Sequence, residues 1–259
     1  MEYRTIELSC SETKELVKWL NAISFTRHIF VGTSKDLYFF AIDYYERFTL
    51  ARSISTVLPE KQVVFNGSTI GIEKEVLLKY FTDVLTNTPG APSVIRIGMD
   101  CASLSEVWLD GMKCTAYHKR SLRYDLTFNY RITSPREFCK HIINFCLLGC
   151  PCTITITDAS GRSYLSVFAE NQLCTFKNLF HLSTIADETI ACTVRQHASI
   201  SVSLRNMRTV HQAIVRQHTV DIALTTGMLG LILDTRSMAI ISDANHDLYS
   251  KTPPQKNKL

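Results

Sequence analysis

Lysine and arginine residues recur opposite the apolar stripes of four predicted helices, an arrangement suited to binding phosphate groups. The helices are predicted over residues 11–22, 73–86, 135–148 and 204–216. A helix that packs one side against a core projects its other side into solvent. Long cationic side chains on that side would contact phosphates without reading bases. The residues expected to make these contacts are Lys14, Lys18, Lys79, Arg136, Lys140, Arg205, Arg208 and Arg216.

The four basic faces differ in clarity. In the helix predicted over residues 73–86, Lys79 points outward, but Glu75 lies near it and Lys74 projects toward the apolar side. One basic helix face alone is usually only a solvated surface. Its recurrence at matching places in both halves of the chain favours a shared phosphate-binding role.

The residues that an enzyme would need are not gathered in a motif. Gly227 and Gly230 lack the following Lys-Ser/Thr of a phosphate-cradling loop, and no Gly-x-Ser-x-Gly elbow occurs. Acidic residues are spread over predicted turns and strand ends, which is ordinary turn chemistry but leaves a two-metal nuclease open as an alternative. These residues are Asp43, Asp100, Asp158, Asp221 and Asp234. We expect no enzymatic activity, no catalytic residue and no cofactor.

Composition and cysteine usage indicate a soluble protein of a reducing, intracellular compartment. The nine cysteines lie mostly in apolar segments, as reduced core thiols do. Cys146, Cys150 and Cys152 are clustered, but their spacing differs from that of a zinc site and no paired histidines follow, so we expect no metal. No leader segment and no apolar run of roughly 18 residues is present, so we expect no membrane partner. The net charge of +4 excludes a polycation that coats nucleic acid.

The two halves of the chain repeat one order of predicted elements: strand, helix, several strands, helix, several strands. Ser9 and Glu12 have capping-box spacing at the first helix, and Ser134 precedes a proline at the start of the third. The tripeptide Asn66-Gly67-Ser68 predicts a hairpin turn.

A short polar run over residues 118–122 divides the halves. The predicted fold class is therefore α+β, with two tandem domains that each contain antiparallel sheets and two helices. The domains are predicted over residues 1–118 and 123–250, and residues 251–259 form a tail that we expect to be disordered.

This order of elements resembles the sliding DNA clamps typified by proliferating cell nuclear antigen (PCNA). The run Ala41-Ile42-Asp43-Tyr44-Tyr45-Glu46-Arg47 stands where those clamps carry a Met-Asp-Ser-Ser-His-Val loop, and the apolar residue and Asp43 match. Ser134-Pro135-Arg136-Glu137-Phe138 resembles the Ser-Gly-Glu-Phe opening of the third clamp helix. The resemblance implies the DNA clamp (PCNA-like) fold, with the eight basic residues facing double-stranded DNA.

Within the clamps, the run Leu20-Asn21-Ala22-Ile23-Ser24-Phe25-Thr26-Arg27-His28 resembles the Leu-x-Ala-Ile-x-Phe-x-x-His turn of the Rad-One family, from the nine-one-one checkpoint ring. This resemblance implies a heterotrimer with Rad-Nine-like and Hus-One-like subunits, a clamp loader and a nuclear location. The ring would encircle DNA at damage sites and recruit checkpoint signalling and repair factors. A replicative or viral PCNA-like processivity factor is the alternative.

Clamp rings close by pairing between exposed strand edges. By position, the expected edges lie over residues 107–117 and 173–179. The expected interface residues are Val107, Leu109, Met112, Cys114, Leu173, Cys174, Phe176 and Leu179. Clamps of this family carry a long connector where partner peptides dock, and residues 118–122 leave little room for one.

Overall fold

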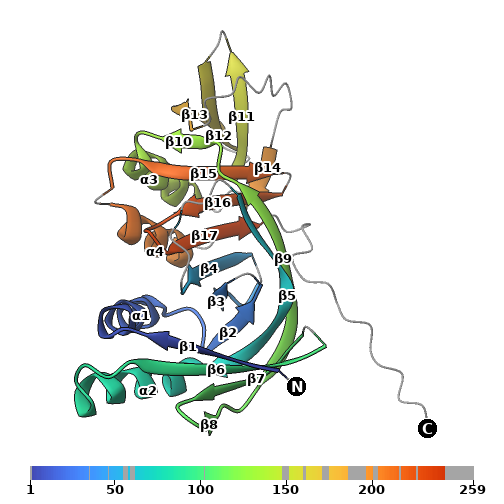
Figure 1. Cartoon of the computed structure of the whole chain (residues 1–259). Helices are drawn as coiled ribbons and strands as arrows, with labels where there is room; N and C mark the ends of the chain where they lie inside the picture. The colour runs from blue at the N-terminus through green and yellow to red at the C-terminus, as the bar shows by residue number, and fades with distance from the viewer. Residues whose placement is uncertain are drawn as a thin grey trace. The chain divides into compact units, whose positions relative to one another are not determined.

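A computed structural model shows two compact units, and each is considered by itself (Figure 1). It describes residues 2–34, 36–45, 47–54, 58, 62–101, 103–147, 152–159, 162–170, 175–185, 197–200, 204–215, 217–225 and 227–242. Among these residues, unit 1 contains residues 2–41 and 65–124, and unit 2 contains residues 42–64 and 125–242. Each unit combines antiparallel sheet with two helices, so the predicted α+β class is confirmed.

The units are not continuous in sequence, unlike the predicted domains. Residues 42–64 belong to unit 2 because β4 (Phe48–Ser53) pairs with β17 (Ser237–Ser242). Their antiparallel register runs from Arg52 opposite Ser237 to Phe48 opposite Ile241. A pairing between strands so far apart in sequence leaves no periodic signal that would place the boundary.

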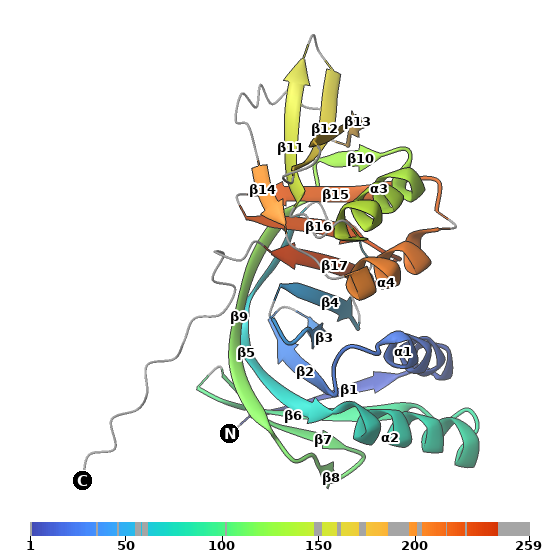
Figure 2. The same ribbon diagram turned by 180° about the vertical axis from the view of Figure 1, so that it is seen from behind.

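Unit 1 contains two helices and two sheets (Figures 1 and 2). The first sheet has the order β1-β6-β7-β8, and the second runs β3-β2-β5-β9. The strand β3 extends one residue beyond the unit, and β5 and β9 each extend three. The elements are β1 (Glu2–Leu8), α1 (Cys10–Ala22), β2 (His28–Thr33), β3 (Leu37–Ile42), β5 (Gln62–Glu73), α2 (Lys74–Asn87), β6 (Ser93–Asp100), β7 (Ser103–Leu109), β8 (Met112–Lys113) and β9 (His118–Thr127).

The predicted capping box starts α1. The Ser9 side chain accepts a hydrogen bond from the Glu12 N–H at 3.3 Å, and the Glu12 carboxylate accepts the Ser9 N–H at 2.9 Å. Thr13 is fully buried, and its hydroxyl donates to the Ser9 carbonyl at 3.0 Å and contacts the Ser93 hydroxyl at 2.9 Å. These bonds fix the start of α1 against β6, so the exposed side of the helix has a defined direction.

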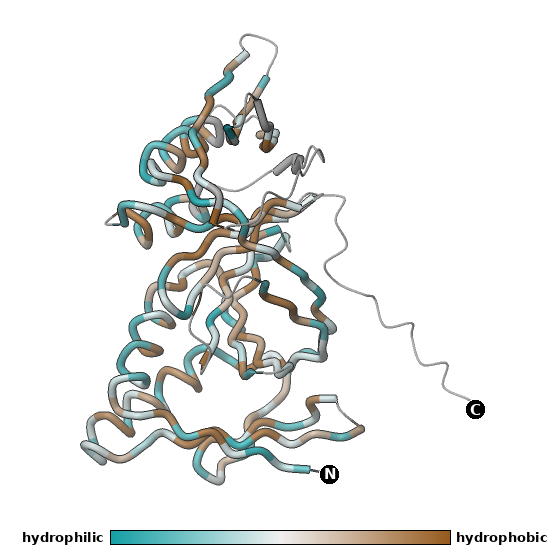
Figure 3. The backbone as a smooth tube through the Cα atoms, turned by 45° about the horizontal axis from the view of Figure 1, so that its top comes forward, coloured by the Kyte–Doolittle hydropathy of each residue, from teal (hydrophilic) through white to brown (hydrophobic). Residues whose placement is uncertain are grey.

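The helices of unit 1 pack against each other and bury the predicted apolar stripes. Leu16 and Leu20 of α1 are buried, as are Leu77 and Phe81 of α2. Figure 3 shows the alternation of hydrophobic and hydrophilic residues along the helices. Among the described residues, no helix is long and apolar enough to cross a membrane.

Two local predictions in unit 1 are wrong. Asn66 and Gly67 form no hairpin turn, because both lie inside β5. A Cβ on Gly67 would come within 3.0 Å of the Thr33 carbonyl oxygen, so this glycine permits a close backbone approach. Residues 118–122 form no linker, because they begin the ten-residue strand β9.

Unit 2 contains one described sheet of nine strands, in the order β14-β11-β12-β13-β10-β15-β16-β17-β4. The pairings between its described strands are antiparallel, and its two helices pack against each other. The remaining elements are β10 (Tyr130–Ile132), α3 (Pro135–Leu147), β11 (Cys152–Ala159), β12 (Arg162–Glu170), β13 (Thr175–Thr184), β14 (His197–Ile200), α4 (Leu204–Ile214), β15 (Val220–Thr225) and β16 (Met228–Ile232).

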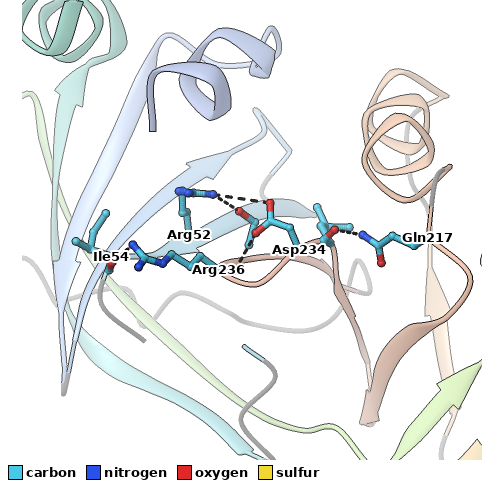
Figure 4. A network of polar contacts seen from close by, with 7 residues as sticks. Arg52, Ile54, Gln217, Asp234 and Arg236 are labelled. Carbon is cyan, nitrogen blue, oxygen red and sulfur yellow. Dashed lines mark hydrogen bonds and ion pairs between the residues drawn. The ribbon is translucent and has the colours of Figure 1, made fainter. Parts of the chain in front are cut away.

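A buried polar network holds the end of β4 to the turn between β16 and β17 (Figure 4). Arg52 is 5% exposed and donates to the Ser237 hydroxyl at 2.9 Å, with the Asp234 carboxylate 3.8 Å away. Arg236 donates from its guanidinium to the Ile54 carbonyl at 2.7 Å. A buried guanidinium needs such partners, and here they fix the long-range pairing that joins residues 42–64 to unit 2.

Candidate nucleic-acid interface

The basic residues of α1 stand in solvent, on the side opposite its buried stripe. Lys14 and Lys18 are exposed, while Leu16 and Leu20 are buried. The two lysines are four residues apart and share one side of the helix. Their exposure opposite the buried stripe agrees with the helical periodicity of the sequence.

The two lysines of α2 have different roles. Lys79 is exposed, as expected of a phosphate contact. Lys74 is half-buried, and its ammonium group donates to the Ile23 carbonyl at 2.8 Å, just beyond the end of α1. It also lies 3.9 Å from the Glu75 carboxylate. Lys74 thus joins the two helices, which explains why the sequence placed it on the apolar side.

In unit 2, α3 presents Arg136 and Lys140 to solvent and buries Phe138 and Ile142. The Lys140 ammonium group lies 3.7 Å from the Glu137 carboxylate on the same helix. An exposed pair of this kind is weak. Lys140 can exchange it for a phosphate.

The last helix, α4, buries Met207, Val210 and Ile214 and exposes Arg208. Arg205 lies in the first turn of α4, and its side chain is outside the described set. Arg216 lies outside the described residues. Exposure is therefore established for six of the eight predicted cations, and every helix contributes at least one. These are Lys14, Lys18, Lys79, Arg136, Lys140 and Arg208.

The predicted edge in unit 1 exposes fewer side chains than expected. Val107, Leu109 and Cys114 are at most 6% exposed, so they belong to the interior of the unit. Met112 is 53% exposed in β8, the last strand of its sheet. What this edge offers a partner is therefore the side chains of Met112 and Lys113 and the backbone of a two-residue strand.

Beside this edge lies a cavity of about 610 Å³ between α2 and β8, which the sequence analysis missed. Val84, Met112 and Cys114 are among its apolar lining residues, and its charged lining residues include Lys79, Asp83, Asp110 and Lys113. Burial raises the pKa of the Cys114 thiol to about 11, so this thiol stays protonated at neutral pH.

A local signal for the position of this cavity was present in the sequence. Asp110 and Gly111 both have positive φ angles, of 44° and 83°, in the turn between β7 and β8. Asp-Gly is the preferred sequence for such a turn. A hairpin predicted there would have brought Met112 back beside β7.

The predicted edge in unit 2 is open. Residues 175–181 of β13 pair with β12 on one side only, because β10 meets β13 at residues 182–184. Phe176 is 38% exposed and Leu179 is 60% exposed. Leu173 and Cys174 lie outside the described residues.

Asp43, which matches the clamp loop, has a structural role. One oxygen of its carboxylate accepts the backbone N–H groups of Arg47 at 2.8 Å and Phe48 at 3.0 Å. The other accepts from the Asn206 amide at 3.1 Å and so joins the loop to α4. The loop displays Tyr44 and Tyr45, which are 89% and 73% exposed.

The dispersed aspartates do not assemble a described metal centre. Asp221 forms a bidentate pair with Arg131, with N···O distances of 2.5 and 3.0 Å. Asp234 accepts the Arg236 N–H at 2.8 Å within a turn. In the part of the chain that the structure describes, no three His, Cys, Asp or Glu side chains are placed to hold a metal ion. The side chain of Asp158 and residue Cys150 lie outside that part.

Comparison with known proteins gives a structural likeness without a sequence match. No protein-family model matches the chain, and no curated protein was found to match it. The β clamp of Helicobacter pylori, solved in complex with 3,4-difluorobenzamide, is similar with a TM-score of 0.51 at 12% identity, over 92% of this chain and 64% of that one. The chain thus spans slightly less than two thirds of the bacterial β clamps it matches.

In two further solved structures, the likeness extends over almost the whole of the other chain. Proliferating cellular nuclear antigen from Entamoeba histolytica is 14% identical with a TM-score of 0.48, over 93% of this chain and 97% of that one. The PCNA2–PCNA3 complex from Sulfolobus tokodaii is 16% identical with a TM-score of 0.38, over 92% and 98%. From its α+β units and its likeness to the Helicobacter pylori protein, the chain has the fold of the sliding DNA clamps.

Proposed function

We propose that this protein is a subunit of a ring-shaped clamp that encircles double-stranded DNA. The observation that carries the proposal is the exposure of cations on all four helices of a clamp fold. Long side chains on helices contact phosphates without selecting a sequence, so the ring can slide. The role is mechanical, with no catalytic step and no cofactor.

The modest net charge agrees with encirclement. At +4, the chain has few excess cations for holding DNA by charge alone. A closed ring stays on DNA because it is topologically linked, so each phosphate contact can be weak and brief. Weak contacts also lower the barrier to sliding.

In the proposed ring, the two units of this chain are joined to those of partner subunits. We propose that the edges of β8 and β13 pair with neighbouring subunits. Met112, Phe176 and Leu179 are the exposed apolar side chains along these edges. The partners are therefore other clamp subunits, together with a loader that opens the ring.

As the finer assignment, we propose the checkpoint ring with Rad-Nine-like and Hus-One-like partners, acting in the nucleus at damaged DNA. Its support is the run from Leu20 to His28, which forms the end of α1 and the entry into β2. Leu20 and Ile23 are buried at that corner. Of the apolar residues of the resemblance, Leu20 and Ile23 are therefore the ones that pack, whereas Ala22 is exposed.

A replicative clamp built from copies of this chain is the second candidate. The observation in its favour is that one chain carries both open edges, with Met112 exposed on β8 and Phe176 and Leu179 exposed on β13, so that copies can pair head to tail. Light scattering separates the two: copies alone form a ring in the replicative case, whereas the checkpoint subunit is monomeric until two different partners are added.

The clamp function itself is tested by DNA topology. The ring, assembled with its partner subunits and loader, is placed on a nicked circular plasmid, and retention is measured by gel filtration. We expect retention on the circle and release when one restriction cut makes the DNA linear. Equal retention on both forms would show ordinary surface binding and contradict encirclement.

A further inference from the structure

The loop between α2 and β6 carries an exposed Thr88-Pro89 dipeptide (Figures 1 and 2). Every residue from Thr86 to Gly90 is exposed. Gly90 has a φ angle of 89°, and a Cβ added to it would meet nothing within 4 Å. The tip of the loop therefore leaves room for another protein to approach the dipeptide.

A hydroxyl side chain followed directly by proline is the sequence that proline-directed protein kinases require. The chain contains this pattern at Thr88, Ser134 and Thr252. Pro135 is buried, so a kinase could not enclose it together with Ser134. Thr252 lies outside the described residues. Within the described part of the chain, Thr88 is consequently the position where hydroxyl and proline are both exposed.

Thr88 is the C-terminal cap of α2, and its backbone has already left the helical conformation. Its φ of −131° and ψ of 65° lie outside the α region, which is disfavoured before a proline. Its N–H and its hydroxyl both donate to the Val84 carbonyl, at 3.2 and 2.9 Å. These bonds satisfy a carbonyl in the last turn of the helix. For the Thr88 Oγ to reach a kinase, only its own hydrogen bond to Val84 has to open.

We propose that Thr88 is a phosphorylation site for a proline-directed protein kinase, and that the phosphate loosens the last turn of α2. The kinase would transfer the γ-phosphoryl group of ATP to the Thr88 Oγ. A bond forms between Oγ and the γ-phosphorus while the bond from that phosphorus to the bridging oxygen of ADP breaks. ADP leaves, and the hydroxyl proton passes to a base of the kinase.

The phosphate would act on α2 by removing a cap and adding charge. The Oγ of a phosphothreonine has no proton to donate to the Val84 carbonyl, and the group carries about −1.5 to −2 charges at pH 7. The carboxyl end of a helix disfavours negative charge, because its free carbonyl groups already make it electronegative. The last turn of α2 should consequently open more often.

The charged side chains that share a cavity with Thr88 do not neutralise this phosphate. They are Glu73, Lys79, Asp83, Asp110 and Lys113. The Lys113 ammonium group is paired with the Glu106 carboxylate. Lys79 lies nine residues before Thr88, about 14 Å along the helix axis. Asp83 lies only five residues before Thr88, so the nearer charge on α2 is repulsive.

Phosphorylation of Thr88 would control ring assembly, and this consequence rests on the proposed function. The lining of the cavity beside β8 includes the last turn of α2, and β8 is the edge proposed to pair with a neighbouring subunit. A loosened last turn should weaken that pairing. The phosphorylation itself involves unit 1 alone and can be measured without a ring.

The first test uses the full chain, ATP and a purified mitogen-activated protein kinase, which is proline-directed. Mass spectrometry should place a phosphate on Thr88. Pro89→Ala keeps the hydroxyl and should abolish this phosphate, whereas Pro92→Ala, at an exposed position in the same loop, should leave it in place. An unmodified Thr88 in the folded chain overturns the proposal, whether or not a peptide of residues 84–93 is modified. Equal modification of Pro89→Ala and the wild type also overturns it.

Hydrogen exchange tests the effect of the phosphate on α2. The amides of residues 85–88 should exchange about twofold to fivefold faster in the phosphorylated chain, as expected for an unfavourable charge at a helix end. Thr88→Val removes the hydroxyl donor without adding charge, so it should give a smaller increase. The amides of α1 are the control and should not change. Equal exchange in the phosphorylated and unmodified chains would overturn the loosening of α2.

Light scattering, with the partner subunits or with copies alone, tests the control of assembly. The phosphorylated chain should assemble less than the unmodified chain. If both forms assemble equally, the ring stands and its control by Thr88 is overturned. If neither form assembles, the proposed ring is wrong, whereas the kinase and exchange experiments still decide the phosphorylation site.

Discussion

Asp43 shows how one side chain can orient a loop. Its carboxylate closes the turn to β4 through the N–H groups of Arg47 and Phe48 and reaches α4 through Asn206. Acceptance of several hydrogen bonds by one carboxylate fixes its orientation. The exposed Tyr44 and Tyr45 are consequently held at a defined place in unit 2. The match of Asp43 to the clamp loop therefore reflects folding of the loop.

Glu106 organises the solvent face of the first sheet of unit 1. Its carboxylate accepts from the Trp108 indole at 3.0 Å and the Tyr3 hydroxyl at 3.3 Å, and it pairs with the Lys113 ammonium group. The Arg96 guanidinium lies 4.3 Å from the centroid of the Tyr3 ring. The hydrogen bond from Lys113 and then that from Trp108 lower the pKa of the Glu106 carboxyl.

This lowered pKa predicts a pH-dependent effect on stability. A carboxyl whose pKa is lower when folded stabilises the fold above its unfolded pKa, and the effect is lost as the pH falls through the folded pKa. Glu106→Gln should lower the melting temperature at pH 7 by no more than about 2 °C, because its partners Lys113 and Tyr3 are exposed to solvent.

Melting curves from pH 7 down to pH 3 check this prediction. The difference between the wild type and Glu106→Gln should hold until the pH drops below the ordinary glutamate value of 4.5 and then disappear. Glu170→Gln, at an exposed position in β12, is the control. A difference that grew in acid would show that the sign of the pKa shift is wrong.

Among the elements, the helices were predictable from sequence and the strand partners were not. The capping box of Ser9 and Glu12 and the stripe of Leu16 and Leu20 are local signals, and the structure confirms them. The partner of β4 is β17, and no local signal records a pairing at that distance. Residues 118–122 were predicted to be a linker because they are mostly polar, and they are polar because one face of β9 is basic and exposed.

In the candidate interface, too, some features could be predicted from local sequence and others could not. The exposed cations follow from helical periodicity, which fixes which side chains lie opposite a buried stripe. The burial of Val107, Leu109 and Cys114 depends on the sheet and helix that cover them, and this information is not local. The cavity beside β8 likewise needs α2 and the β7–β8 turn together.

The open edge of β13 predicts an assembly defect. Leu179→Asp places a charge at a 60% exposed position, so the fold should be kept while pairing with a neighbouring subunit weakens at least about tenfold. Mass measurement by light scattering with the partner subunits, or with copies alone, detects the loss. Val64→Asp, at a position that is 48% exposed in β5, should assemble normally.

In the whole molecule, basic residues on the helices and a modest net charge both agree with retention on DNA by encirclement. Retention by topology needs only weak phosphate contacts, and their removal should impair loading or sliding more than folding. The combined change of Lys14, Lys18, Arg136 and Lys140 to alanine lowers the net charge from +4 to 0 (4 − 4). If these side chains contact phosphates, each lost contact should reduce, by about 0.9, the steepness with which the logarithm of the DNA-binding constant falls with the logarithm of salt concentration.

The matched control removes four exposed arginines that lie outside the helices: Arg4, Arg27, Arg123 and Arg162. It makes the same change of net charge. Because these arginines lie outside the helices, their loss should leave the salt dependence of DNA binding and the loading rate close to those of the wild type. Both variants should keep their melting temperature, because an isolated surface substitution changes stability by about 0.5 kcal/mol or less. If the helix variant and the control lose equal amounts of DNA retention, net charge alone governs binding and the helices do not face the duplex.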